Sequence, residues 1–163
     1  MHTFHFDRAW TFAVPADELF SVLDRTDDFR RWWTWLRHFD TTSPSSSAAA
    51  LSAGVQANCL IQGPVPYALR LQVEIERVER PTLVETHVRG DLDGPARLEV
   101  QPTPAGSTAR LSWELELRDA TLRRINRFAR PLMEWAHDRV VGMGVEQFRR
   151  HALAGDVSRV SET

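Results

Sequence analysis

Lysine is absent from the sequence: all 20 basic residues are arginine, against 22 acidic residues. Mechanisms that require a Schiff-base lysine are therefore excluded. The arginines are scattered along the chain, and the formal net charge is only -2. Because a nucleic-acid-binding domain typically carries a concentrated basic face, we expect no nucleic-acid partner.

Cysteine occurs once, at Cys59. A single cysteine forms no internal disulfide and no cysteine metal cluster, which fits a reducing compartment and a fold stabilised by packing. The six histidines lack HxxxH spacing, and the glycines form neither a phosphate loop nor a dinucleotide-binding fingerprint. The sequence thus predicts no metal and no cofactor.

Long hydrophobic runs are missing as well. No stretch approaches the roughly 18 apolar residues that a membrane span needs. The amino-terminal segment, MHTFHFDRAW, lacks the basic start and apolar core of a signal peptide. We therefore expect a cytoplasmic protein without a membrane span. A length of 163 residues fits one domain, which we place at 1–154, followed by a disordered tail at 155–163.

The patterns that are present begin with an alternating segment. Apolar side chains at most even positions from Phe4 to Val14 predict a half-buried strand. Two short helices are expected next, over Ala16–Asp24 and Asp28–Trp35; the first has acidic residues in its opening turn, where the helix dipole favours them. The small and polar segment 43–53 is interpreted as a flexible connection.

Period-two patterning then continues from Gly54 to Leu117. Pro81, the run Gly90–Pro95 and the segment 102–106 divide this region into consecutive strands. Because turns this short join only antiparallel neighbours, the region predicts an antiparallel meander.

The last part of the chain, from Thr121 to about Leu153, changes to a helical period with one broad apolar face. Pro131 lacks a backbone donor and is expected to kink or interrupt this helix. A face this wide needs a wide partner, and the concave side of a curved sheet is the one available. The pattern therefore predicts an α+β helix-grip fold, in which a curved antiparallel sheet of about six to seven strands surrounds a long carboxy-terminal helix and two short helices follow the first strand.

Several segments together carry a family resemblance: VPADELFSVL followed by DDFRRWWTWL, then PVPYALRLQVEIERVERP, RGDLDGPARLEV and MEWAHDRVVGMGVEQF. They resemble the START/Bet v 1-like (SRPBCC) superfamily, in its bacterial polyketide cyclase/dehydrase-type branch. The resemblance implies a cavity between sheet and helix, which across the superfamily takes sterols, lipids, polyketides, hormones or flavonoids. It carries over no catalytic set.

Candidate ligand contacts follow from this placement. Trp32, Trp33 and Trp35 cluster where the fold places the cavity entrance, and broad aromatic rings suit an apolar ligand. On a helix only Trp32 and Trp35 share a face, and packing in the core explains these residues equally well. The other candidates lie on the strands of the sheet floor or on the terminal helix: Tyr67, Leu69, Leu71, Val73, Trp113, Leu115, Met133, Trp135, His137 and Gly144.

His137 is the weak catalytic candidate, as a hydrogen-bonding group or general base at the edge of the apolar helix face. A boundary histidine bonded to the backbone is the alternative. His137 and Asp138 are helix neighbours whose side chains diverge by about 100°, so no His-Asp pair is expected. Arg89, which flanks Gly90 together with Asp91, and Arg139 could pair with a carboxylate of a ligand or of the protein, although a surface or structural ion pair is the usual role of such an arginine.

Three hypotheses for function stay open, because one fold hosts carriers, sensors and enzymes alike. The first is a protein that binds a small hydrophobic or aromatic ligand, lipid-like or polyketide-like, in the cavity. The second is an aromatase/cyclase-like enzyme acting on a polyketide or related carbonyl compound. The third is a partner protein with a small or filled cavity that acts through its surface. The expected partner is a small apolar molecule, and a homodimer is left open.

Overall fold

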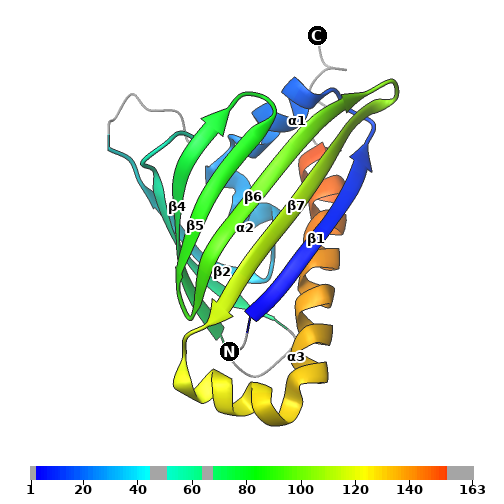
Figure 1. The fold of residues 1–163 in the computed structure, drawn as a ribbon. Coiled ribbons are helices and arrows are strands. Elements are labelled where there is room, and N and C mark those ends of the chain that lie inside the picture. The colour runs from blue at the N-terminus through cyan, green and yellow to red at the C-terminus, as the bar shows by residue number, and fades with distance from the viewer. Residues whose placement is uncertain (1–2, 45–50, 64–67, 154–163) are drawn as a thin grey trace.

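A computed structural model of the chain describes residues 3–44, 51–63 and 68–153 (Figure 1). Tyr67, most of the predicted connection 43–53 and the predicted tail 155–163 lie outside the described residues. In chain order the elements are β1 (Thr3–Phe12), α1 (Ala16–Leu23), η1 (Thr26–Asp28), α2 (Phe29–Trp32), β2 (Leu36–Thr42), β3 (Gln56–Gln62), β4 (Ala68–Glu79), β5 (Leu83–Gly90), β6 (Leu92–Thr103), β7 (Gly106–Leu117), α3 (Ala120–Gln147) and η2 (Phe148–Leu153).

The strands form one seven-stranded sheet in the order β1-β7-β6-β5-β4-β3-β2, and every neighbouring pair is antiparallel. The sheet curves around α3 (Figure 1), which confirms the predicted helix-grip fold. Strand β2 was not predicted. Its sequence, LRHFDTT, buries only Leu36 and forms the outer edge of the sheet, so it lacks the apolar alternation by which the other strands are recognised.

The predicted turn Gly90–Pro95 is shorter than expected, because β6 already begins at Leu92. Asp91 stabilises the turn by accepting a hydrogen bond from the backbone nitrogen of Arg70 at 2.8 Å. Gly94 therefore lies within the strand, at a φ of 151°. A Cβ at this position would collide with the backbone carbonyl oxygen of Glu114, so the close approach of β7 requires glycine here.

The second predicted helix, Asp28–Trp35, is also shorter in the structure. A 3-10 turn, η1, leads into α2, which ends at Trp32, and Trp33 already has extended backbone angles, φ -113° and ψ 104°. The prediction that Trp32 and Trp35 share a helix face is therefore wrong. A turn follows, in which the backbone nitrogen of Leu36 donates to the carbonyl oxygen of Trp33 at 3.2 Å, and the rings of Trp33 and Trp35 lie together with centroids 5.5 Å apart.

Helix α3 begins with the side chain of Asp119, which accepts a hydrogen bond from the backbone nitrogen of Leu122 at 2.8 Å. Pro131 lies inside the helix, which continues past it to Gln147. Figure 1 shows the helix changing direction where its colour passes from yellow to orange, the part that contains Pro131, in agreement with the predicted kink. The first turns thus cross one end of the sheet, and the rest runs along it.

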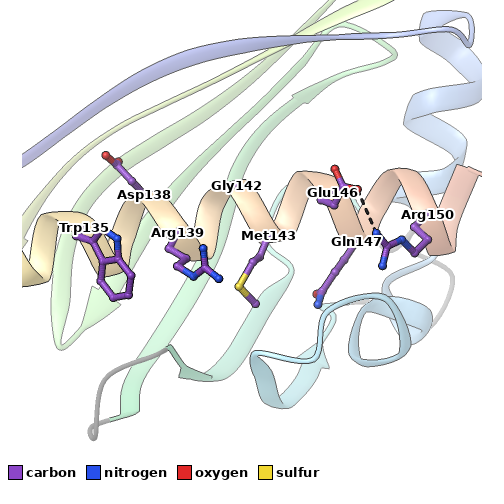
Figure 2. A pocket seen from close by; sticks show the side chains of 8 residues that line it. All are labelled: Trp135, Asp138, Arg139, Gly142, Met143, Glu146, Gln147 and Arg150. Carbon is purple, nitrogen blue, oxygen red and sulfur yellow. Dashed lines mark hydrogen bonds and ion pairs between the residues drawn. The ribbon is translucent and has the colours of Figure 1, made fainter.

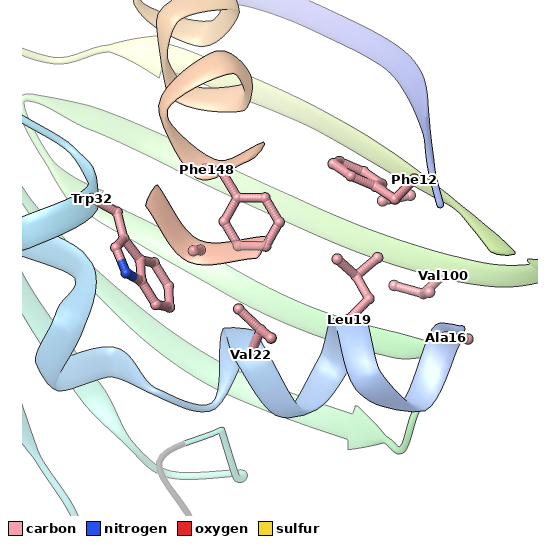
Figure 3. Packing of buried hydrophobic residues seen from close by; sticks show 9 residues of the cluster. Phe12, Ala16, Leu19, Val22, Trp32, Val100 and Phe148 are labelled. Atoms are coloured by element: carbon pink, nitrogen blue, oxygen red, sulfur yellow. The ribbon is translucent and has the colours of Figure 1, made fainter. Parts of the chain in front are cut away.

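One end of the space between α3 and the sheet holds a cluster of buried side chains, and we call it the filled end (Figure 3). Four of its members, Phe12, Leu19, Ala109 and Phe148, also border the cavity described below. Side chains of α1, α2 and η2 meet there against β6 and β7. Trp32 belongs to this cluster, is only 5% exposed and stacks edge to face on Phe148. The candidate Trp32 is therefore a core residue, not a cavity residue. The buried members are Phe12, Ala16, Leu19, Val22, Trp32, Val100, Ala109, Phe148 and Ala152.

Candidate ligand-binding cavity

A cavity of about 550 Å³ lies between the concave face of the sheet and α3. Drug-sized ligands typically occupy pockets of roughly 300 to 1,000 Å³. Most of the predicted contacts lie on its wall, from β4, β7, α3 and the segment after α2: Trp33, Trp35, Leu69, Leu71, Val73, Trp113, Leu115, His137 and Gly144. Met133 lies on α3, but its side chain is outside the described part of the structure.

Trp135 is not part of the cavity. It is 51% exposed and lines a separate hollow of about 570 Å³ on the outer side of α3 (Figure 2), with the guanidinium of Arg139 5.9 Å from its ring centroid. The helix geometry explains this correction, because two residues span about 200° around the axis. When His137 faces the cavity, Trp135 must point nearly the opposite way.

Sequence reasoning placed no ligand contacts on β1 and β5, yet both strands contribute to the wall. Phe4 and Trp10 extend into it from β1, and Thr86 and Val88 from β5. The signal was present in β1, whose alternating aromatic residues formed one face of the predicted strand. What was missing was the curvature of the sheet, which decides how far along each strand the cavity extends.

The segment that carries Trp33 and Trp35 is fastened to the second half of α3. Nε1 of Trp33 donates to the carbonyl oxygen of Gly144 at 2.8 Å. Thr34 and Gln147 exchange two hydrogen bonds, at 3.2 and 2.9 Å. A Cβ on Gly144 would lie 3.4 Å from the ring of Trp35, so the glycine lets this ring approach the helix closely. The two indole rings are 5.5 Å apart and form one end of the cavity.

His137 is held among aromatic rings at the other end. Its ring centroid lies 5.1 Å from that of Trp113 and 5.2 Å from that of Phe6, both edge to face. Burial is the main cause that lowers the pKa of His137 below its usual 6.5, although Asp138 opposes it. The ring is therefore neutral at pH 7.

The prediction that His137 and Asp138 do not pair is wrong. Nδ1 of His137 lies 3.5 Å from Oδ1 of Asp138. Nδ1 is the ring nitrogen nearer the backbone, so a short aspartate on the next residue reaches it although the two Cβ atoms diverge. Asp138 also lies 3.6 Å from the guanidinium of Arg8 on β1, so the carboxylate bridges helix and strand.

Three buried nitrogen atoms on the cavity side chains have no hydrogen-bond partner among the described residues: Nε1 of Trp35, Nε1 of Trp113 and Nε2 of His137. Buried polar atoms are normally paired, because an unpaired one costs about 1 to 3 kcal/mol. No sequence signal marks them, since pairing depends on which atoms happen to meet in three dimensions.

The remaining candidates lie away from the cavity. Arg89 pairs with Glu74 at 2.8 Å on the outer face of the sheet, which is the surface role expected of it. Burial raises the pKa of the Cys59 thiol to about 11, so this thiol stays protonated and unreactive. In residues 3–44, 51–63 and 68–153 no group of three His, Cys, Asp or Glu side chains is arranged to hold a metal ion. None of the helices in these ranges is long and apolar enough to cross a membrane.

Comparisons with known proteins agree with this architecture. The family model described as polyketide cyclase / dehydrase and lipid transport matches residues 3–152. No curated protein matches the chain.

Among solved structures, TTHA0849 from Thermus thermophilus superposes with a TM-score of 0.73 at 12% identity, covering 94% of this chain and 98% of its own. The Zhui aromatase/cyclase from Streptomyces sp. R1128 gives 0.69 at 14% identity, covering 94% and 99%. The two-domain aromatase/cyclase BexL of the BE-7585A biosynthetic pathway gives 0.70 at 14% identity, covering 92% of this chain and 50% of BexL. At such identities these similarities establish the fold.

Proposed function

Because the chain belongs to the polyketide cyclase/dehydrase and lipid transport family of the SRPBCC superfamily, we propose that it binds one small hydrophobic or aromatic molecule, lipid-like or polyketide-like, between the sheet and α3. The cavity carries this proposal. Its volume of about 550 Å³ suits a molecule of a few fused rings, and its wall is almost entirely aliphatic and aromatic.

The wall also explains why an apolar ligand would prefer this site to water. Leucine and valine side chains of β4, β6 and β7 form the floor, while Val140, Val141 and Val145 of α3 form the roof. A ligand that fills the space removes apolar surface from water on both sides, which contributes about 25 cal/mol per Å². It also supplies contacts that the lining atoms lack.

A fluorescent probe tests the proposal directly. N-phenyl-1-naphthylamine is uncharged, and its emission rises in apolar surroundings. We expect saturable emission with one probe per chain, and we expect Gly144→Leu to abolish it, because the new side chain meets Trp35 at the cavity wall.

Gly142→Leu is the matched control, because Gly142 is on the same helix but faces the outer hollow and has no atom near its Cβ position. Probe binding that is unaffected by Gly144→Leu, or equally lost in both variants, would contradict the cavity as the site. If the probe results support the cavity as the site, native mass spectrometry of protein purified gently from its own host identifies the natural ligand.

A second candidate function, an aromatase/cyclase-like enzyme, is favoured by one observation. His137 faces the cavity as a neutral imidazole with a carboxylate at Nδ1, which is the arrangement of a general base. The test is His137→Ala: an enzyme would lose turnover of a bound carbonyl substrate while its affinity stays the same. The third hypothesis, a partner protein with a filled cavity, lacks the observation that would favour it, because the described residues enclose a large cavity.

A further inference from the structure

A hydrogen-bond donor and a hydrogen-bond acceptor, both without a partner among the described residues, lie on two rings that contact each other at the His137 end of the cavity. The indole Nε1–H of Trp113 can only donate, and neither it nor Nε2 of His137 has a partner among the described residues. The two rings meet edge to face, with centroids 5.1 Å apart and an interplanar angle of 84°. Two unpaired polar atoms on rings in direct contact point to a missing third group.

Asp138 determines which ring nitrogen of His137 is the acceptor. Its carboxylate lies 3.5 Å from Nδ1, and a carboxylate can only accept. The proton of the neutral imidazole is therefore favoured on Nδ1, which leaves the lone pair on Nε2. The pair thus offers one donor, from Trp113, and one acceptor, from His137.

The hydroxyl of Thr86 and the guanidinium of Arg97, which also lie on the cavity wall, are occupied. Thr86 donates from Oγ1 to the carbonyl oxygen of Ala96 at 3.1 Å. Arg97 forms ion pairs with Glu85 and Glu99 at 3.7 and 2.8 Å. The unpaired Nε1 of Trp35 adjoins Gly144, which is seven residues, or roughly 10 Å along the helix axis, from His137. This nitrogen is too far from His137 to bond the same ligand atom.

We propose that Trp113 and His137 together recognise a hydroxyl group on an aromatic ligand, that is, a phenol. This proposal rests on the proposed function of the cavity. A hydroxyl oxygen accepts from Nε1–H of Trp113 while its own proton is donated to Nε2 of His137, so one atom of the ligand satisfies both nitrogens. An ether or a carbonyl oxygen satisfies only Trp113. Both nitrogens are covered by neighbouring rings, so the hydroxyl enters by separating the two ring edges.

Three probes of the same shape test the proposal on the full chain: naphthalene, 2-methoxynaphthalene and 2-naphthol, each measured by displacement of N-phenyl-1-naphthylamine. We expect 2-naphthol to bind about five- to tenfold more tightly than 2-methoxynaphthalene, the difference that one additional hydrogen bond provides. His137→Phe should remove this preference, because the hydroxyl proton then has no acceptor, whereas Trp113→Phe should weaken 2-naphthol and 2-methoxynaphthalene alike relative to naphthalene on the same variant. Trp10→Phe is the matched control, because Trp10 lines the same cavity but lies opposite Ala109 on β7 rather than opposite Trp113, and it should keep the preference.

Nitrogen-15 NMR provides a readout that does not depend on a folded variant. The chain has six tryptophans, and the indole N–H signal of Trp113 should move downfield with 2-naphthol and with 2-methoxynaphthalene, which both carry an acceptor oxygen, and not with naphthalene. If naphthalene binds but 2-naphthol shows no preference, or if Trp10→Phe removes the preference as fully as His137→Phe does, the phenol proposal is overturned and the cavity function stands. If none of the three displaces the fluorophore, the proposed function itself fails.

Discussion

The filled end and the cavity lie on the same curved sheet beneath the same helix, yet one is packed and the other is hollow. At the filled end, α1 and α2 insert Leu19, Val22 and Trp32 between β6 and η2. Along the rest of α3 no other described helix is inserted, and the side chains of helix and sheet that meet at His137 leave the space beside them open. Apart from Thr86, Arg97 and His137, the wall of the cavity is as apolar as the filled end.

This comparison shows that the cavity arises from the topology of the fold rather than from its amino-acid composition. Aliphatic side chains on β4 and β7 would pack well if an element lay against them, as Val100 does on β6. The short helices α1 and α2 are long enough to cover only one end. An apolar surface left without a covering element is what a ligand of matching shape can bury.

Replacing one valine at the filled end and one valine in the cavity wall by alanine has the largest expected effect on stability. Val100 is 1% exposed in the filled end, and Val73 lines the cavity from another strand of the same sheet. We expect Val100→Ala to lower the free energy of unfolding by about 2 to 3 kcal/mol, because it opens a void in packed surroundings. Val73→Ala should cost about 1 kcal/mol or less, because its atoms already face empty space. Urea denaturation of both variants measures this, and equal losses would mean that the cavity is collapsed in solution.

Enlargement of the same two valines should again be tolerated better in the cavity than at the filled end. Val100→Phe overpacks the filled end and is expected to cost about 1 to 3 kcal/mol. Val73→Phe places its ring in the cavity, so stability should change by less than about 1 kcal/mol while binding of N-phenyl-1-naphthylamine is lost. Denaturation and probe titration on each protein separate the two effects. A Val73→Phe protein that still binds the probe fully would put the ligand elsewhere.

The same comparison explains which parts of the structure could be predicted from the sequence. Periodicity located the helix-grip fold and the inward faces of β4 and β7, because burial on one side of an element repeats with the period of that element. It therefore identified Leu69, Leu71 and Trp113 as part of the cavity wall. Assigning a residue to a face in this way needs no knowledge of distant contacts.

The errors concern the tryptophans and His137, where short-range geometry decides. Trp32 was grouped with Trp33 and Trp35 because the end of α2 could not be seen, and one residue of extended backbone exchanges their faces. Trp135 was placed in the cavity because a broad apolar face leaves the rotation of the helix open. The unpaired nitrogens of Trp113 and His137 have no sequence signature, since they depend on which side chains meet after folding.

Alanine at the two helix glycines sharpens the comparison at a smaller scale. Gly142 faces outward with no atom within 4 Å of its Cβ position, so Gly142→Ala should stabilise the protein by about 0.5 to 1 kcal/mol through helix propensity alone. Gly144→Ala should gain at least as much, because its methyl group meets the Trp35 ring at an ordinary contact distance of 3.4 Å. Thermal denaturation compares the two. A destabilised Gly144→Ala protein would show that the cavity wall near Trp35 is already tightly packed.

The smallest expected effect is a pH dependence of stability, which tests whether the cavity excludes water at His137. Only Asp138 and Arg8 contribute charge at His137, while the rings of Phe4, Phe6 and Trp113 surround it. Burial lowers the pKa of the His137 ring in the folded protein below 6.5, its usual value in the unfolded chain. Well above pH 6.5 the ring is therefore neutral in both the folded and the unfolded protein. As the pH falls below 6.5, the unfolded state binds the proton first, and stability declines until the pH has passed the lower folded-state pKa. We therefore expect the free energy of unfolding to fall more between pH 7 and pH 5 in the wild type than in His137→Phe. Equal slopes would mean that water reaches the ring, and the cavity would then be a hydrated pocket.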